Sequence, residues 1–246
     1  PAMSPDMNDT AAIFGFSPHL EALRARVRRF IDEEAIPRER PALAHDVAAL
    51  DAVLAELRPI AQRAGIYAPQ LPVSLGGQGL SWRDRSVVLE ELGRSFLGAG
   101  ALNCAPPDQP NMISLIEQGS DAQRARWLGP LASGAIRSCF AMTEPQPGAG
   151  SDPSMLRTRA ERRDGGWVIN GRKWFISGAI GARFAIVLAM TDEGATQFLV
   201  DADNPGMRVL RTGVSGGVEE LPALKIITGH MGEGLPFHLD PIQSMP

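Results

Sequence analysis

The spacing of hydrophobic residues changes once along this chain, near Ile136, and that change limits the fold more than any other feature. Before Ile136, apolar residues recur every three or four positions, which is typical of amphipathic helices. After it, short runs rich in branched and aromatic residues alternate with Gly, Asp and Asn, which is typical of strands joined by turns. The sequence therefore predicts an α+β protein whose helices come first.

Capping and stop signals place the helices of the first half. Ser17-Pro18 is expected to begin one helix, because serine caps a helix and proline suits its first turn. A second helix is expected from about Asp46 to Gly65, with a kink at Pro59. Ser81 and Asp84 have the spacing of a capping box for a third. Two shorter helices are expected at 111–118 and 121–128.

The second half is expected to form a compact antiparallel β-barrel-like domain. Its turn signals are 164–166, 170–171 and 192–194, which predict that neighbouring strands pair antiparallel. The segment 212–246 is rich in Gly and Pro and is expected to be an irregular tail without strands or a long helix. The expected strands are 136–142, 157–162, 167–169 with 173–176, 184–191, 196–201 and 207–211. The expected domains are 1–135 (N-terminal, helical), 136–211 (middle, β) and 212–246 (tail).

Composition excludes several classes of function. The 24 Lys and Arg residues are scattered among 28 Asp and Glu residues, which argues against nucleic-acid binding. Cys104 and Cys139 are too few for a disulfide framework and lack the spaced partners of a zinc site, so we expect small buried thiols and no metal. No membrane span and no export signal are expected, and the chain has the composition of an intracellular protein. The four histidines decide nothing.

The stretch from Phe140 to Asp152, FAMTEPQPGAGSD, runs from an expected strand into a glycine-rich loop. Glycines let backbone N–H groups approach a phosphate or a flat ring, and Thr143 and Ser151 offer hydroxyl groups. The same residues also fit a long strand connection in which Asp152 caps its own backbone. The spacing matches neither a nucleotide-hydrolase phosphate loop nor a GxGxxG turn.

A second stretch, WVINGRKWFISG from Trp167 to Gly178, puts aromatic residues and a hydroxyl group at a strand end. Taken alone, Trp174 and Phe175 would be core residues. Together, the two stretches resemble the flavin-contacting segments in the middle domain of the acyl-CoA dehydrogenase family. The resemblance extends in order over residues 20–211. Further segments similar to the family's N-terminal helical domain are GIYAPQLP from Gly65, LGGQGL from Leu75, LEELGRS from Leu89 and the QxxxWLxPLxxG pattern from Gln123.

The resemblance implies an FAD-dependent oxidoreductase of fatty acid metabolism that converts the Cα–Cβ bond of an acyl-CoA thioester to a double bond. Ser151 matches the serine near the FAD pyrophosphate and the acyl-CoA pantetheine. Ser177 matches a hydroxyl near the reactive flavin nitrogen, and Glu144 and Asp152 are interpreted as loop-shaping groups. The matched cofactor-binding residues are Phe140, Ala141, Met142, Thr143, Ser151, Phe175, Ile176 and Ser177.

Two departures from the family pattern limit this interpretation. The loop is two residues longer than the commonest form, so Pro145 to Gly148 are expected to bulge. The family continues after Arg211 with more strands and a helical bundle, which supplies the catalytic glutamate and the oligomer interface; neither is recognisable here. Glu219, Glu220 and Glu233 match no position of the base and are interpreted as solvated charges.

Three functions therefore stay open. The first is an acyl-CoA dehydrogenase-type enzyme, incomplete as this chain, with an electron-transfer flavoprotein as its acceptor and a homo-oligomeric state implied by the family. The second is a non-catalytic module that binds flavin, acyl-CoA or a protein partner. The third keeps the fold but oxidises nitroalkanes, reduces oxygen or hydroxylates aromatics. The implied compartment is the cytoplasm of a bacterium, or the mitochondrion or peroxisome of a eukaryote.

Overall fold

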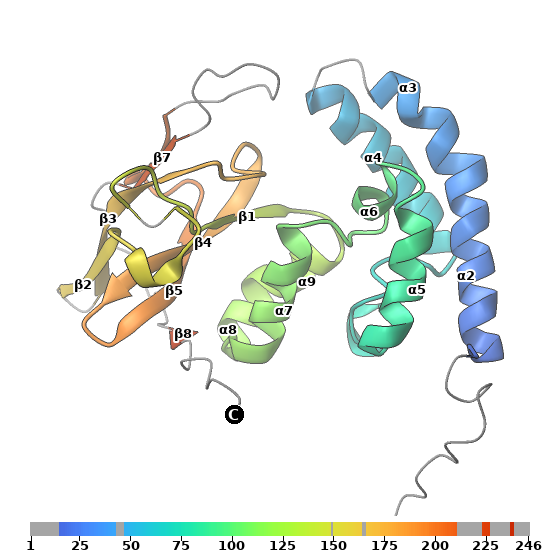
Figure 1. The fold of residues 1–246 in the computed structure, drawn as a ribbon, viewed down its shortest axis with the longest axis horizontal. Coiled ribbons are helices and arrows are strands. Elements are labelled where there is room, and N and C mark those ends of the chain that lie inside the picture. The colour runs from blue at the N-terminus through green and yellow to red at the C-terminus, as the bar shows by residue number, and fades with distance from the viewer. Residues whose placement is uncertain are drawn as a thin grey trace, which may run out of the picture. The chain divides into compact units, whose positions relative to one another are not determined.

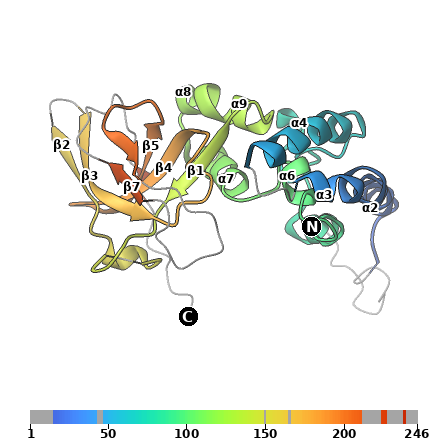
Figure 2. The same ribbon diagram turned by 90° about the horizontal axis from the view of Figure 1, so that it is seen from above.

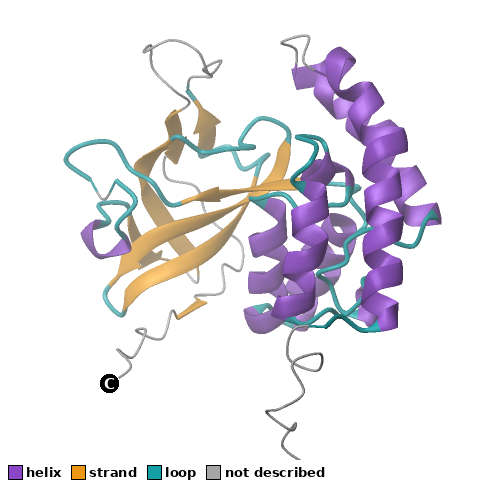
Figure 3. Ribbon diagram, turned by 45° about the vertical axis from the view of Figure 1, so that its right-hand side comes forward, coloured by secondary structure: helices purple, strands orange, loops and turns teal. Residues whose placement is uncertain are grey.

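The computed structural model describes residues 15–42, 47–148, 150–163, 166–210, 223–226 and 237–238. The chain divides into two compact units, Pro1–Ala105 and Pro106–Pro246. Figure 1 labels their helices and strands. Figure 3 shows that every described strand belongs to the second unit, whereas the first unit consists of helices and loops.

The first unit is built from helices, as the spacing of its apolar residues predicts. Ser17 Oγ accepts a hydrogen bond from Leu20 N at 3.1 Å, and Ser81 Oγ accepts one from Asp84 N at 3.2 Å, so both predicted N-caps are confirmed. Gly65 follows the second helix with a φ of +63°, which suits glycine at a helix C-terminus. The elements are α2 (Pro18–Phe30) with the turns Ile31–Ala35 and Ile36–Arg38, α3 (Glu39–Ala42), α4 (Val47–Arg63), a 3₁₀ turn (Val73–Leu75), α5 (Trp82–Leu92) and α6 (Gly98–Ala101).

The second unit begins with short helices that pack on its sheet. α7 (Asp108–Gln118) contacts the first strand, β1 (Arg137–Ala141), and Asn111 Nδ2 donates to Ser138 Oγ at 2.9 Å. The two expected helical segments are thus confirmed, although they pack with the sheet. The domain boundary at 135 stays a prediction. The other helical segments are α8 (Asp121–Gln123), a π turn (Arg124–Leu128) and α9 (Gly129–Ala132).

One mixed sheet follows. Its strand order is β6-β7-β3-β2-β4-β5-β8, and β1 lies beside β4 off this path (Figure 2). β1 pairs parallel with β4, whereas β2 and β3 form one antiparallel hairpin and β4 and β5 another. The other strands are β2 (Arg159–Arg163), β3 (Gly166–Trp174), β4 (Ala182–Thr191), β5 (Gly194–Asp201), β6 (Met207–Val209), β7 (Ala223–Ile226) and β8 (Phe237–His238).

The expectation of an antiparallel, barrel-like domain is therefore wrong in two respects. The sheet is mixed, and the described strands form an open path. Turn signals report only the pairing of strands that are joined by a short hairpin. β1 instead leads into a long loop and pairs with a strand 45 residues later along the chain, Arg137 being opposite Ala182.

Two further expectations are corrected. The Asn170-Gly171 signal marks no turn, because both residues lie inside β3. Gly171 is needed there for close packing, since a Cβ at this position would lie 2.2 Å from Thr158 Oγ1. The tail was expected to contain no strand, but β7 pairs with both β3 and β6, and β8 pairs with β5. Its other residues lie outside the described part of the chain.

Alternation along the strands puts apolar side chains on both faces of the sheet. Ala185, Val187 and Ala189 of β4 join one buried cluster, and Leu188 joins another together with Leu156. β1 divides in the same way, because Ala141 packs in the first cluster and Phe140 in the second. The end of β1 is thereby held between two cores.

Candidate functional site

The ends of β1 and β3 lie side by side, so the two motif-bearing stretches meet. Trp174 N donates to Thr143 O at 3.1 Å. The residues that precede Thr143 and Trp174 form a second hydrogen bond, since Lys173 Nζ donates to Met142 O at 2.9 Å. We call these adjoining segments, residues 140–143 and 174–177, the strand-end wall.

The strand-end wall and its loop present hydroxyl groups that are available to a ligand. Ser151 and Ser177 are exposed, and Thr143 is half-buried. Among the described residues, none accepts or donates a hydrogen bond to these three hydroxyl groups. Each can therefore donate to an acceptor on a bound molecule without breaking an existing bond.

Four of the predicted residues face the core. Ala141 and Ile176 are 0% and 4% exposed and belong to one buried cluster, and Phe140 and Met142 pack against the other. Their side chains serve packing in this structure. Ala141 and Ile176 can contribute only their backbone groups to a surface at the strand-end wall, whereas Phe140 and Met142 are partly exposed.

Phe175 is exposed in an unusual backbone conformation. Its side chain is 48% exposed and its φ is +54°, a region that bulky residues rarely adopt. Its ring meets the edge of the Trp174 ring with centroids 4.5 Å apart. Phe175 is therefore an accessible aromatic surface and not a core residue.

The glycine-rich loop closes on itself. Glu144 N donates to Gly150 O at 3.0 Å, and Gly148 N donates to Pro145 O at 2.7 Å. The extra residues of the loop therefore form a turn that leaves the strand-end wall and returns to it. Gly148 is required in this turn, because a Cβ there would lie 2.7 Å from Glu144 Oε2.

A buried ion pair anchors this loop. Glu144 Oε1 accepts from Lys173 Nζ at 2.8 Å, and the two side chains are 2% and 0% exposed. Glu144 also accepts from the backbone N–H groups of Arg157 and Thr158 at 2.7 and 2.9 Å. One carboxylate thus joins the end of β1, the end of β3 and the start of β2.

The pKa values of this pair follow from burial and hydrogen bonding. Burial opposes the charge of Glu144, but the hydrogen bonds from Lys173 and from the backbone outweigh it and hold the pKa at about 2. Burial lowers the pKa of Lys173 to about 8, although Glu144 acts in the opposite direction. Both groups are therefore mainly charged at neutral pH.

Lys173 is the functional-site residue that sequence reasoning missed, and a signal for it existed. Trp167, Ile169, Gly171 and Lys173 occupy alternate positions of β3, and the apolar members are buried. A lysine that continues an inward-facing row needs a buried partner. The supposed turn at Asn170-Gly171 divided the strand and concealed this row.

The remaining titratable candidates have local roles. Asp152 Oδ1 accepts from Ser154 N and Oγ at 2.9 and 2.7 Å, which lowers its pKa, so its interpretation as a loop-shaping residue is confirmed. Cys104 and Cys139 are buried, and burial raises the pKa of each thiol to about 12. Within the described ranges, no group of three His, Cys, Asp or Glu residues is arranged to hold a metal, and no helix is long and apolar enough to cross a membrane.

Two models of one protein family match this chain. The model described as acyl-CoA dehydrogenase, N-terminal domain, matches residues 17–135, and the model described as acyl-CoA dehydrogenase, middle domain, matches residues 139–228. The chain belongs to the acyl-CoA dehydrogenase family. Both the strand-end wall and the Glu144–Lys173 pair fall within the match to the middle domain.

Relatives within the acyl-CoA dehydrogenase family agree with this assignment. The (R)-benzylsuccinyl-CoA dehydrogenase of Thauera aromatica is 37% identical over 212 residues, which cover 80% of this chain and 52% of that protein. A Mycobacterium abscessus structure assigned as an acyl-CoA dehydrogenase superposes with a TM-score of 0.79 at 33% identity, covering 89% of this chain and 60% of that one. A glutaryl-CoA dehydrogenase from Mycobacterium smegmatis in complex with FADH2 gives 0.64 at 26%, with coverage of 93% and 56%.

The chain spans only part of its curated relatives. It covers 52% of the Thauera protein and 21% of the mouse acyl-CoA dehydrogenase family member 10. Family membership therefore holds for residues 17–228. The activity, substrates and partners of a whole family member are matters for proposal.

Proposed function

We propose that this chain provides the FAD-binding half of an enzyme that introduces a Cα–Cβ double bond into an acyl-CoA thioester. The observation that carries the proposal is the junction of β1 and β3, where Trp174 N bonds Thr143 O at 3.1 Å. It brings together the two segments whose sequences resemble the flavin-contacting segments of the family. The family member in complex with FADH2 supports the choice of cofactor.

The residues of the strand-end wall suit a flavin. Thr143 and Ser177 offer hydroxyl groups without a hydrogen-bond partner among the described residues, and such donors match the heteroatoms of the ring. Phe175 offers an exposed aromatic face, and the backbone groups of residues 140–142 and Ile176 line the same two segments. FAD supplies the hydride-accepting chemistry when bound.

Ser151 is proposed to bind both the pyrophosphate of FAD and the pantetheine of the thioester, because its exposed hydroxyl group lies in the loop anchored by Glu144. No carboxylate of the described residues is proposed as the catalytic base, since Glu144 is committed to Lys173 and Asp152 caps its own turn. We propose that the base comes from outside residues 1–246.

The wider assignments are also proposals. They are the helical domain at 1–135 and the β domain at 136–211, a homo-oligomeric state, an electron-transfer flavoprotein as acceptor, an intracellular location and a role in fatty acid metabolism. The domain bounds rest on the change of hydrophobic spacing near Ile136 and the location on composition, whereas the other assignments rest on family membership.

The proposal is tested by the visible absorption spectrum of the purified full chain and by the change of that spectrum when an acyl-CoA is added. The chain is mixed with FAD, freed of excess cofactor and examined for the visible flavin band, and an acyl-CoA is then added without oxygen. Retained flavin whose band bleaches, with acetate added to replace the base that is proposed to come from outside this chain, supports the proposal. The proposal is contradicted if the chain retains no flavin, or if no acyl-CoA that is tested changes the flavin absorption band.

The second candidate, a non-catalytic module, is favoured by the lack of a candidate base among the described carboxylates. The same experiment separates the two functions. A band that shifts without bleaching shows a thioester bound beside the ring without turnover, and that outcome selects the module.

A further inference from the structure

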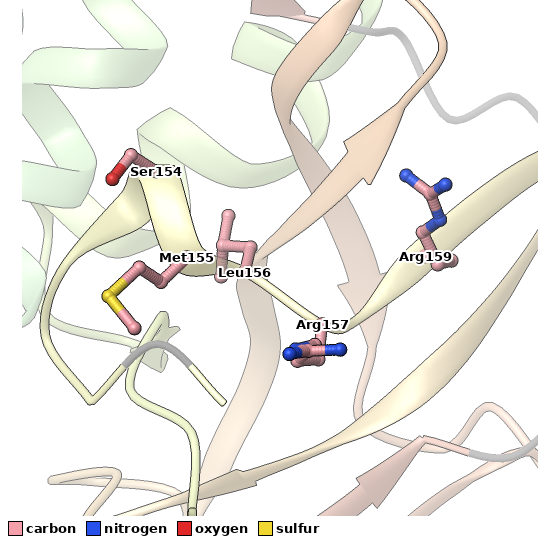
Figure 4. A pocket seen from close by; sticks show the side chains of 5 residues that line it. All are labelled: Ser154, Met155, Leu156, Arg157 and Arg159. Atoms are coloured by element: carbon pink, nitrogen blue, oxygen red, sulfur yellow. The ribbon is translucent and has the colours of Figure 1, made fainter. Parts of the chain in front are cut away.

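A cavity lies beside the anchored loop. It has a volume of about 540 Å³ and is lined by Ser154, Met155, Leu156, Arg157 and Arg159. Figure 4 shows these side chains, which come from the 3₁₀ turn Pro153–Met155 and from the residues that lead into β2. This volume falls in the range of sites for small molecules.

The two arginines of this cavity lack a counter-charge. Arg157 and Arg159 are both exposed, and neither forms an ion pair with a carboxylate of the described residues. Arg163 lies four residues after Arg159 on β2 and, unlike the two arginines of the cavity, forms an ion pair with Glu161 at 2.9 Å. The cavity therefore holds positive charge that the described fold does not neutralise.

The strand register adds a third arginine. Arg159 is opposite Asn170 in the antiparallel pair of β2 and β3, so extending the pair by two residues puts Arg157 opposite Arg172. The packing of Thr158 against Gly171 supports this extension. Arg172 is exposed and also has no ion pair within the described residues.

We propose that Arg157, Arg159 and Arg172 bind the diphosphate group that FAD and CoA have in common. Guanidinium groups form paired hydrogen bonds with phosphate oxygens, and Met155, which is 56% exposed, offers apolar surface to the rest of the ligand. The inference deepens the proposed function and rests on it for the identity of the ligand.

The anchoring of Arg157 connects this site to the strand-end wall. Its backbone N–H donates to Glu144 at 2.7 Å, and Glu144 also holds the end of β3 through Lys173. A ligand that reaches from the wall to the arginines is thus bound by two surfaces fixed to one carboxylate.

The test measures the affinity of the full chain for inorganic pyrophosphate, CoA and FAD by titration calorimetry. The variant is Arg157→Gln with Arg159→Gln, and the control is Arg183→Gln. Arg183 is exposed and lies on β4, seven residues before Met190, the partner of Arg159, and hence roughly 23 Å away at ~3.3 Å per residue. We expect the double variant to bind pyrophosphate at least ~10-fold more weakly and the control to match the parent chain.

The two nucleotides identify the source of the diphosphate. A loss for CoA alone assigns the arginines to the thioester, and a loss for FAD alone assigns them to the cofactor; either result supports the proposal. Equal pyrophosphate affinity in the parent chain and the double variant overturns it, as does an equal loss in Arg183→Gln or a parent chain that binds no pyrophosphate.

An acyl-pantetheine thioester, which lacks the diphosphate, separates this inference from the proposed function. If it changes the flavin band while pyrophosphate affinity is the same in all variants, only the inference fails. If no thioester changes the band, the proposed function fails whatever the pyrophosphate result.

Discussion

Among the described residues, each unit buries one glutamate, and the two are neutralised in different ways. In the first unit, Glu91 on α5 accepts from Arg24 Nε at 2.8 Å and from Arg28 Nη2 at 2.6 Å, and those arginines are 28% and 53% exposed. In the second unit, Glu144 faces a lysine that is fully buried, together with two backbone N–H groups. The partly exposed guanidinium groups around Glu91 can exchange a lost contact for water, whereas the fully buried Glu144–Lys173 pair, which we call the dry pair, cannot.

The difference shows what each carboxylate does for the fold. Glu91 joins two neighbouring helices, α2 and α5, which also pack through apolar side chains such as Leu23 and Val88. Glu144 joins three separate backbone segments, the end of β1, the end of β3 and the start of β2, beside the candidate ligand site. We therefore expect loss of the first interaction to affect stability alone, and loss of the second to affect both stability and the ligand site.

Breaking the dry pair should have the largest effect. Lys173→Met leaves Glu144 buried without its cation, and removal of one partner from such a pair costs about 3–5 kcal/mol. Urea unfolding should show this loss, and retained FAD should fall with it. The double variant with Glu144→Gln should recover part of the stability, because no buried charge is then left unpaired. A single variant as stable as the parent chain would refute the anchoring role.

Lowering the pH should have the second-largest effect on the unfolding free energy, because it protonates Glu144. The pKa of Glu144 is about 2 in the folded chain and 4.5 as the ordinary value, so its contribution is complete above pH 4.5 and is lost as the pH falls toward 2. Glu144→Gln should flatten the dependence of unfolding free energy on pH in this window. The matched control is Asp152→Asn in the exposed turn, which should leave most of that dependence in place. A parent curve identical to that of Glu144→Gln would contradict the assignment.

The sequence predicted the helical unit better than the sheet, for a physical reason. Helix signals are local, so Ser17 and Gly65 mark their boundaries without reference to the rest of the chain. The parallel pairing of β1 with β4 depends on residues 45 positions apart, which no turn signal reports. The site was predicted through its motifs, but the role of Lys173 was not, because a glycine needed for packing at 171 resembles a turn glycine.

Removal of the charge on Glu91 should have a smaller effect, confined to stability. Glu91→Gln keeps the shape of the side chain but weakens its bonds to two arginines, which should cost about 1–3 kcal/mol of unfolding free energy. The affinity for FAD, measured at a temperature where the variant is folded, should stay that of the parent chain. A parallel fall in FAD affinity would show that the two carboxylates do not differ as argued.

The hydroxyl groups of the wall should show the smallest effects, with the opposite pattern. Thr143→Val and Ser177→Ala should each weaken FAD binding by about 2- to 10-fold, the range expected for one neutral hydrogen bond. Unfolding free energy should change by less than about 0.5 kcal/mol, since neither hydroxyl group is bonded within the described fold. Ser74→Ala, at an exposed serine of the first unit whose hydroxyl group has no hydrogen bond within the described residues, serves as the control and should change neither quantity.

Amide hydrogen exchange with and without FAD tests the strand-end wall most directly. The account predicts that FAD slows exchange in residues 140–143 and 174–177 together, and that Lys173→Met abolishes this protection in both segments. Protection of one segment without the other, or protection confined to the helices of the first unit, would contradict the claim that the ends of β1 and β3 form one binding surface.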